Sequence, residues 1–214
     1  MTDLTVDFQT DVCELPPPQL PTAATLADAL RKRASARNFS PDALTLEQLS
    51  ALLWAAFGIN RPDNGHRTAP SARNWQEIDV YTVTADASYR YDAAHHRLEL
   101  VKAADLRATT GRQDFVASAP LNLVYVADYE RMPDVSGDDR AFLAGADAGC
   151  IAQNVYLYCA STGLATVVRA LIDRKALALA LGLRPSQHIA LAQSVGWPAS
   201  QLGERWSMTV PHNV

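Results

Sequence analysis

Two arginines placed four residues apart, with a serine between them, are the side chains of this sequence best suited to binding an anion. The segment reads Arg33-Ala34-Ser35-Ala36-Arg37. Two guanidinium groups can fork onto a phosphate group, while the serine hydroxyl donates one more hydrogen bond. A simpler interpretation stays open, because basic residues at the C-terminal end of a helix are common and stabilise its dipole.

Other polar side chains give weaker signals. Arg169 follows a predicted strand, where it could contact a carboxylate or phosphate of a substrate or form a surface ion pair. The histidines lack metal-ligand spacing and are predicted to be surface or loop residues: His66, His95, His96, His188 and His212. The cysteines lack zinc or dithiol spacing and are predicted to be buried free thiols: Cys13, Cys150 and Cys159.

The elements that must position these residues follow from capping signals and hydrophobic periodicity. Thr45 and Gln48 form a capping box, which predicts a helix that Gly58 ends. Apolar residues cover most of a predicted helix over 139–161, so this helix should be buried on several sides. Another helix should start at 25 and end near 35–39. Further helices are predicted over 103–117 and 173–181, and strands over 78–84, 89–92, 98–101, 121–127, 164–168 and 187–195.

This mixture of single strands, a hairpin and helices predicts an α+β sandwich rather than a regular βαβ alternation. No Gly-x-Gly-x-x-Gly follows a predicted strand, which argues against a Rossmann dinucleotide site. The polar stretch 60–76 is predicted to be a loop, and it is long for a mere connection.

The bulk composition suits one compact domain, since the chain has 214 residues of which 48% are hydrophobic. Prolines crowd residues 15–21, so we predict an extended arm over 1–22 and a single domain over 23–214. A net charge of -4 argues against nucleic-acid or anionic-membrane partners. The longest apolar run, 51–57, is too short for a membrane span, and acidic residues stand where a secretory signal would be basic. We therefore expect a cytoplasmic protein.

Three separated blocks resemble motifs of the FMN-dependent nitroreductase family. Residues 33–39 are similar to its opening Arg-x-Ser-x-Arg-x-Phe motif, and residues 69–76 (Ala-Pro-Ser-Ala-Arg-Asn-Trp-Gln) to its Pro-Ser-x-x-Asn-x-Gln segment. Residues 147–167 resemble the family's long central helix and the strand after it. The turn Val-Gly-Trp-Pro at 195–198 is similar to the family's Val-Gly-Tyr-Pro, so the resemblance covers most of the chain. Residues 54–58 and 67–71 look closest to the branch with SagB-type azoline dehydrogenases.

The resemblance implies an α/β sandwich with a central, mostly antiparallel sheet flanked by helices, and a homodimer with two FMN sites at the subunit interface. By this resemblance Arg33 and Ser35 bind the flavin phosphate, and Arg37 tunes the flavin by stabilising negative charge at its N1 and O2 edge. The reaction itself takes place on flavin N5, so no separate catalytic residue is implied. The implied cofactor-binding residues are Arg33, Ala34, Ser35, Arg37, Pro70, Ser71, Ala72, Asn74, Gln76, Thr166, Val167, Ala170 and Arg205.

The activity implied by the resemblance is hydride transfer from NADH or NADPH, through flavin N5, to a small acceptor such as a nitroaromatic or a quinone, in a ping-pong cycle. Two alternatives remain, a peptide azoline dehydrogenase that needs a partner protein and an FMN-binding module without catalysis. The chain also departs from the family pattern. Ala170 and Leu171 stand near where well-studied members carry a Glu-Gly pair, and Arg205 is the only cation near the C-terminus for the phosphate.

Overall fold

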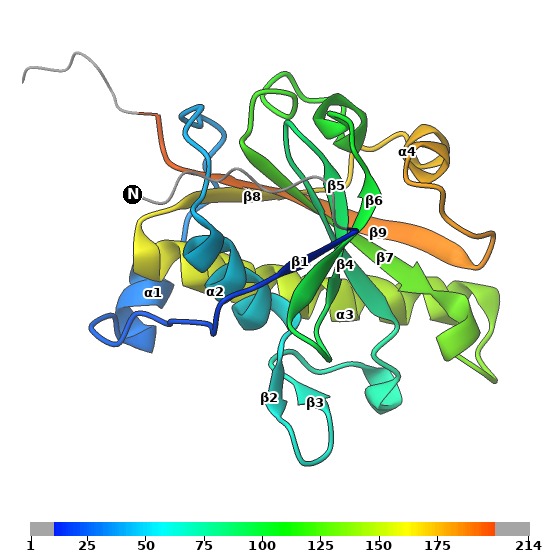
Figure 1. Cartoon of the computed structure of the whole chain (residues 1–214). Coiled ribbons are helices and arrows are strands. Elements are labelled where there is room, and N and C mark those ends of the chain that lie inside the picture. The colour runs from blue at the N-terminus through cyan, green and yellow to red at the C-terminus, as the bar shows by residue number, and fades with distance from the viewer. Residues whose placement is uncertain (1–10, 200–214) are drawn as a thin grey trace, which may run out of the picture.

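A seven-stranded antiparallel sheet forms the centre of the protein (Figure 1). The structure is a computed structural model, which describes residues 11–199. The strand order is β1-β6-β5-β4-β7-β9-β8, and each neighbouring pair is antiparallel. The strands are β1 (Val12–Glu14), β4 (Ile78–Val83), β5 (Ser88–Asp92), β6 (Arg97–Lys102), β7 (Leu121–Asp128), β8 (Ala165–Arg169) and β9 (Gln187–Gly196). The predicted α+β class and antiparallel sheet are confirmed.

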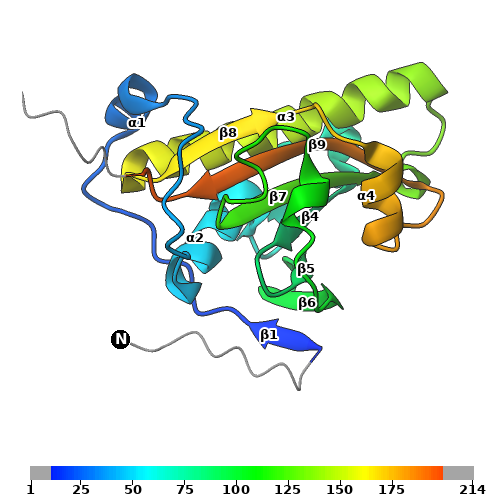
Figure 2. The same ribbon diagram turned by 90° about the horizontal axis from the view of Figure 1, so that it is seen from above.

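Strand β7 shows why its sequence is apolar throughout rather than alternating. All of its residues are buried, because both faces of the sheet are covered. Leu123 and Tyr125 belong to the core cluster shared with α2 (Leu46–Phe57) and α3 (Gly137–Thr162). Val124 and Val126 pack with α4 (Arg174–Ala180) on the opposite face (Figure 2).

The capping residues correctly predicted the positions of α2, α3 and α4. The capping box of Thr45 and Gln48 is present at the start of α2. Gly58 follows this helix, where a Cβ atom would lie 2.6 Å from the Trp54 ring. Ser136 caps α3, which begins two residues earlier than predicted, and Gly163 ends it with a left-handed φ of 81°. Asp173 caps α4, as predicted.

Two helix predictions were wrong. The first helix, α1 (Leu26–Lys32), ends before residue 33, because residues 33–37 bind other elements instead. The predicted helix over 103–117 is only a 3-10 turn, η2 (Arg107–Thr110). Its polar side chains bind nearby backbone groups: Asp105 accepts from the Arg107 amide, and the Thr110 hydroxyl donates to the Arg107 carbonyl. Such local bonds compete with helix formation.

The segment 60–76, predicted as a loop, contains short regular pieces. A small hairpin pairs β2 (Ile59–Arg61) with β3 (His66–Arg67), and a 3-10 turn, η1 (Ala72–Asn74), follows. The remaining 3-10 turn, η3 (Tyr129–Arg131), follows β7. The segment therefore carries a defined backbone shape between α2 and β4.

The proline-rich stretch 15–21 runs along the surface after β1, which pairs with the edge of β6. The carbonyl of Pro16 accepts a hydrogen bond of 2.5 Å from the Ser50 hydroxyl, and His96 lies 2.7 Å from the same hydroxyl. The other nitrogen of the His96 ring lies 2.8 Å from the Tyr91 hydroxyl. His96 is thus the loop residue that was predicted, and its ring joins this stretch to α2 and the β5–β6 hairpin.

Cysteine burial differs from the prediction. Cys159 is buried, Cys13 is half-buried and Cys150 is exposed, and all three are free thiols. Cys150 is exposed because it lies on an outward face of α3, where Phe142 is also 74% exposed. Within residues 11–199, no helix has the length and apolar character needed to cross a membrane.

Candidate functional site

The segment 33–37 leaves α1 as a loop and lies against the C-terminal half of α3 and the edge of β8. The Arg33 amide donates to the Ala29 carbonyl at the end of α1, and the Ala36 amide donates across to the Thr166 carbonyl at 3.0 Å. The Ala36 amide therefore bonds to β8 instead of to a carbonyl one turn earlier, and α1 does not continue through this segment. The two arginines are therefore not simply the last turn of a helix, which was the alternative interpretation.

Tyr156 on α3 organises the centre of this loop. Its hydroxyl accepts a hydrogen bond of 3.0 Å from the Val168 amide on β8 and lies 2.8 Å from the Ser35 hydroxyl. With Tyr156 donating to Ser35, the Ser35 hydrogen is available for a bound anion. Sequence reasoning missed Tyr156; its only signal was an aromatic hydroxyl inside a mostly apolar helix.

The two arginines give this loop a positive charge. The guanidinium of Arg33 lies 5.4 Å from the centre of the Tyr156 ring, a cation–π contact. Arg33 and Arg37 are both exposed. Over residues 11–199, neither forms an ion pair with a carboxylate. The loop can therefore hold an anion such as a phosphate group.

Strand β8 contributes backbone rather than side chains. The Thr166 side chain is buried, donates to the Ser194 carbonyl at 2.8 Å and accepts from Gln193 at 3.0 Å. Val167 is buried as well. Ala170 and Leu171, after the end of the strand, are exposed. No carboxylate stands at these two positions.

Both predictions for Arg169 were wrong, since among residues 11–199 it forms no ion pair with a carboxylate and only 4% of its surface is exposed. Its side chain is buried and donates to the Thr110 carbonyl at 2.7 Å, to Asn122 at 2.8 Å and to the Ser194 hydroxyl at 3.1 Å. Burial lowers the pKa of this guanidinium to about 10. The residue is a structural link between β8, β7, β9 and η2, and its polar partners lie too far apart in the sequence to be recognised there.

The second block, residues 70–76, forms a tight loop around η1. Gln76 receives a hydrogen bond from Arg67 at 2.8 Å, and its amide donates to the Gly65 carbonyl and to Asn74. The backbone amide of Gln76 donates to the Ser71 hydroxyl at 3.0 Å. Pro70 and Asn74 are exposed, whereas Ser71 and Ala72 are half-buried.

The two blocks contact α3 at different places. The Ala72 amide donates to Asp147 at 2.8 Å, whereas Ser35 contacts Tyr156. These two α3 residues are nine positions apart, which is about two and a half turns or about 13 Å along the axis, so they face opposite sides of the helix. One copy of the chain therefore presents the two blocks on opposite faces of α3.

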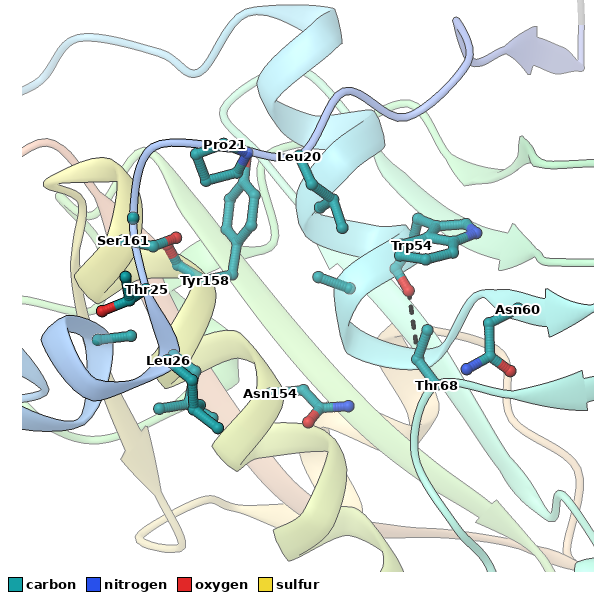
Figure 3. Close-up of a pocket in the computed structure, with 14 residues that line it drawn as sticks. Leu20, Pro21, Thr25, Leu26, Trp54, Asn60, Thr68, Asn154, Tyr158 and Ser161 are labelled. Atoms are coloured by element: carbon teal, nitrogen blue, oxygen red, sulfur yellow. Dashed lines mark hydrogen bonds between the residues drawn. The ribbon is translucent and has the colours of Figure 1, made fainter.

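An open hollow of about 380 Å³ lies between α1, α2 and α3. Figure 3 shows Leu26, Trp54 and Tyr158 around it, with Thr68 donating a hydrogen bond of 3.2 Å to the Trp54 carbonyl. The ring nitrogen of Trp54 donates to the Ile59 carbonyl. Leu20 and Leu26 at its edge remain 43% and 66% exposed, so the hollow is lined in part by exposed apolar side chains.

Comparison with known proteins identifies the family. Residues 30–197 match the model of the nitroreductase family. A Methanocaldococcus jannaschii protein designated as a nitroreductase is 34% identical over 152 residues, which cover 66% of this chain and 76% of that protein.

Solved structures share the fold. A protein of Ralstonia eutropha described as a nitroreductase is 46% identical and covers 89% of this chain and 91% of its own, with a TM-score of 0.85. An FMN complex of a Desulfovibrio desulfuricans protein (22% identity, 89% and 98% covered) has a TM-score of 0.60. A chain of the Escherichia coli microcin synthetase complex (19% identity, 89% and 79% covered) has a TM-score of 0.66.

Proposed function

Since the chain belongs to the nitroreductase family, we propose that it is an FMN-dependent oxidoreductase. The proposed substrates are NADH or NADPH as hydride donor and a small acceptor such as a nitroaromatic or a quinone. When bound, the flavin supplies the redox chemistry at N5, and the protein must hold it, tune it and admit the substrates.

The observation that carries this proposal is the loop 33–37, in which two arginines without a carboxylate partner among residues 11–199 flank a serine hydroxyl that contacts Tyr156. This arrangement fits a phosphate monoester, because the Arg33 guanidinium and the Ser35 hydroxyl both lie beside Tyr156. Arg33 and Ser35 would hold the phosphate, beside the backbone of Ala34. Arg37 would stand at the N1 and O2 edge of the ring and favour the negatively charged, reduced form.

Other residues would orient the ring. The loop that contains Pro70, Ser71, Ala72, Asn74 and Gln76 would lie along it, and the backbone of Thr166, Val167 and Ala170 would face its N5 edge. Arg205, the C-terminal candidate for the phosphate, lies outside the described residues.

A homodimer would bring both blocks to one flavin. The two blocks lie on opposite sides of α3 within one chain, so a second copy would have to supply one of them. The outward face of α3 suits such contact, because Phe142 and Cys150 are exposed there and the neighbouring Gly145 and Gly149 have open space around them. Closed symmetric dimers are the commonest oligomers.

A second candidate function is a peptide azoline dehydrogenase. The likeness in fold to a chain of the microcin synthetase complex supports considering it, as does the resemblance of residues 54–58 and 67–71 to the SagB-type branch. A third candidate function is an FMN-binding module without catalysis, in which residues 33–37 would bind the FMN phosphate in the same way.

The test is the visible spectrum of the purified protein, taken before and after anaerobic addition of NADH and then NADPH. We expect flavin absorption bands that bleach with one of the two nucleotides and return when a quinone is added. A flavin that stays oxidised with both nucleotides would favour the dehydrogenase or the module. A protein that cannot take up FMN would overturn the proposal.

A further inference from the structure

A carboxyl group with no donor lies directly behind the 70–76 loop. Glu77 is fully buried, and neither of its side-chain oxygens has a hydrogen-bond donor among residues 11–199. Its backbone is fixed, because the Glu77 carbonyl accepts from the Asp128 amide at 2.9 Å. An ionised carboxylate without donors is costly in such a place, so this side chain must find another way to be satisfied.

The neighbouring group is a second carboxyl. Asp147 on α3 is 8% exposed, and its side chain interacts with Glu77 and helps to raise the Glu77 pKa. Two carboxylates cannot bond to each other unless one carries a proton. Burial, followed by the charge of Asp147, raises the pKa of Glu77 to about 7. Below neutral pH Glu77 is therefore mostly protonated and has a proton that it can donate to Asp147.

The other charged groups around this carboxyl pair are already engaged. Arg131 on η3 lowers the pKa of Glu77 slightly, but it donates to both oxygens of Asp79 on β4 at 2.9 Å. It also donates to the Gln76 carbonyl. Arg67 on β3 donates to Gln76 and to the Phe57 carbonyl. Neither arginine donates a hydrogen bond to the Glu77 side chain.

Asp147 connects the carboxyl pair to the loop, because it accepts the 2.8 Å hydrogen bond from the Ala72 amide. The loop needs such a contact. Arg73, Asn74 and Gln76 have positive φ angles of 48°, 55° and 50°, a region that non-glycine residues adopt only at some cost in energy. This shape persists only while surrounding contacts hold it.

We propose that Glu77 and Asp147 share one proton and act as positioning residues, which hold the 70–76 loop in place through the Ala72 amide only while the proton is bound. Loss of the proton leaves two negative charges side by side in a buried site, where they repel each other and displace Asp147 from Ala72. The loop then relaxes from its strained shape. The consequence for FMN binding rests on the function proposed above, whereas the effect on the loop does not.

The direct test is hydrogen exchange at the Ala72 amide, expressed as a protection factor at about pH 6 and about pH 8.5. In the wild-type protein we expect protection to fall about tenfold at the higher pH, since Glu77 passes from mostly protonated to mostly ionised. The variant Glu77→Gln, which always carries a donor, should keep its protection at both pH values. The matched control is Glu130→Gln, an exposed residue, which should behave as the wild type.

A titration of the wild-type protein alone guards against a variant that does not fold. With the glutamate carboxyl carbons labelled with carbon-13, NMR should show one glutamate that titrates near neutral pH. The proposal is overturned if every glutamate titrates below about pH 5.5. It is equally overturned if Ala72 loses protection to the same extent in the wild type and in Glu77→Gln.

FMN affinity, followed by flavin fluorescence, separates this inference from the proposed function. We expect the wild type to bind FMN several-fold more weakly at about pH 8.5 than at about pH 6, and Glu77→Gln to bind equally at both. Equal wild-type affinity at both pH values would overturn the link to the site. If FMN does not bind at any pH while Ala72 and Glu77 behave as expected, the proposed function fails and the positioning role stands.

Discussion

At the scale of single residues, the site depends on what each side chain is already bonded to. Ser35 is oriented by Tyr156, and Arg33 and Arg37 have no carboxylate partner over the described part of the chain, so these groups remain available to a ligand. Arg169, by contrast, is buried and donates its hydrogen bonds to the Thr110 carbonyl and to Asn122. The sequence left a ligand contact open for all three arginines, and burial separates the two binding candidates from the structural one.

Arg33→Ala should weaken FMN binding by at least about tenfold, since a charge-assisted hydrogen bond contributes about 1.5–3 kcal/mol. Fluorescence titration of the apoprotein with FMN measures this directly. Arg31→Ala is the matched control, because Arg31 lies two residues earlier, within α1, pairs with Asp28 and has a side chain that is 74% exposed; the affinity of this variant for FMN should be unchanged. Equal affinities of the two variants would remove Arg33 from the phosphate site.

Arg37→Gln should lower the reduction potential of the bound flavin, because a positive charge near the polar edge of the ring stabilises the reduced, anionic form. The potential is measured by anaerobic titration against a reference dye. Arg37→Lys keeps the charge and should restore most of the wild-type potential. An unchanged potential in Arg37→Gln would assign Arg37 no role in tuning.

At the scale of elements, local signals predicted what local interactions decide. The caps of α2 and α4 and the apolar run of β7 were predicted from the sequence. A helix cap depends on residues close together in the chain, and burial on both faces of a strand requires consecutive apolar residues. The turn η2 was mistaken for a helix because side-chain bonds to its own backbone compete with helix formation. The short strand β1 exists only through its pairing with β6, more than eighty residues away in sequence.

Gly111→Ala tests the junction between η2 and β8. A Cβ atom at this position would lie 2.2 Å from a guanidinium nitrogen of Arg169, which its hydrogen bonds hold in place. We expect a loss of about 1–3 kcal/mol in the free energy of unfolding, measured with urea. Gly137→Ala, at a position with no atom nearby, should stay within about 0.5 kcal/mol of the wild type. Equal stability of both variants would contradict the crowding around Arg169.

At the scale of the whole molecule, α3 connects the two blocks of the candidate site and also separates them. The family and the antiparallel α+β fold were predictable from the blocks and the periodicity. The opposite placement of residues 33–37 and 70–76 was not, because it depends on the direction in which each loop approaches the helix. Glu77 also escaped prediction, since its neighbour Asp147 lies seventy positions later in the sequence.

Cys150→Arg on the outward face of α3 should convert the proposed dimer into a monomer and reduce FMN affinity, because a charge without a partner is costly in an apolar interface. Analytical ultracentrifugation gives the mass. Leu179→Arg on α4, where the side chain is 85% exposed, serves as the control and should leave the mass unchanged. A wild-type protein that sediments as a monomer at micromolar concentration would contradict the dimer.

The unequal lengths of β8 and β9 have a consequence for solubility. Strand β9 extends past the end of β8, and pairing with β8 covers only residues 192–196. Arg174 donates to the Ile189 carbonyl at 2.9 Å and to the Ala190 carbonyl at 3.1 Å. A guanidinium thus occupies acceptors that a strand from another molecule would otherwise bind, and uncovered strand edges are sites where aggregation begins. We therefore expect this one arginine on a short helix to keep the end of the sheet from pairing with a strand of another molecule.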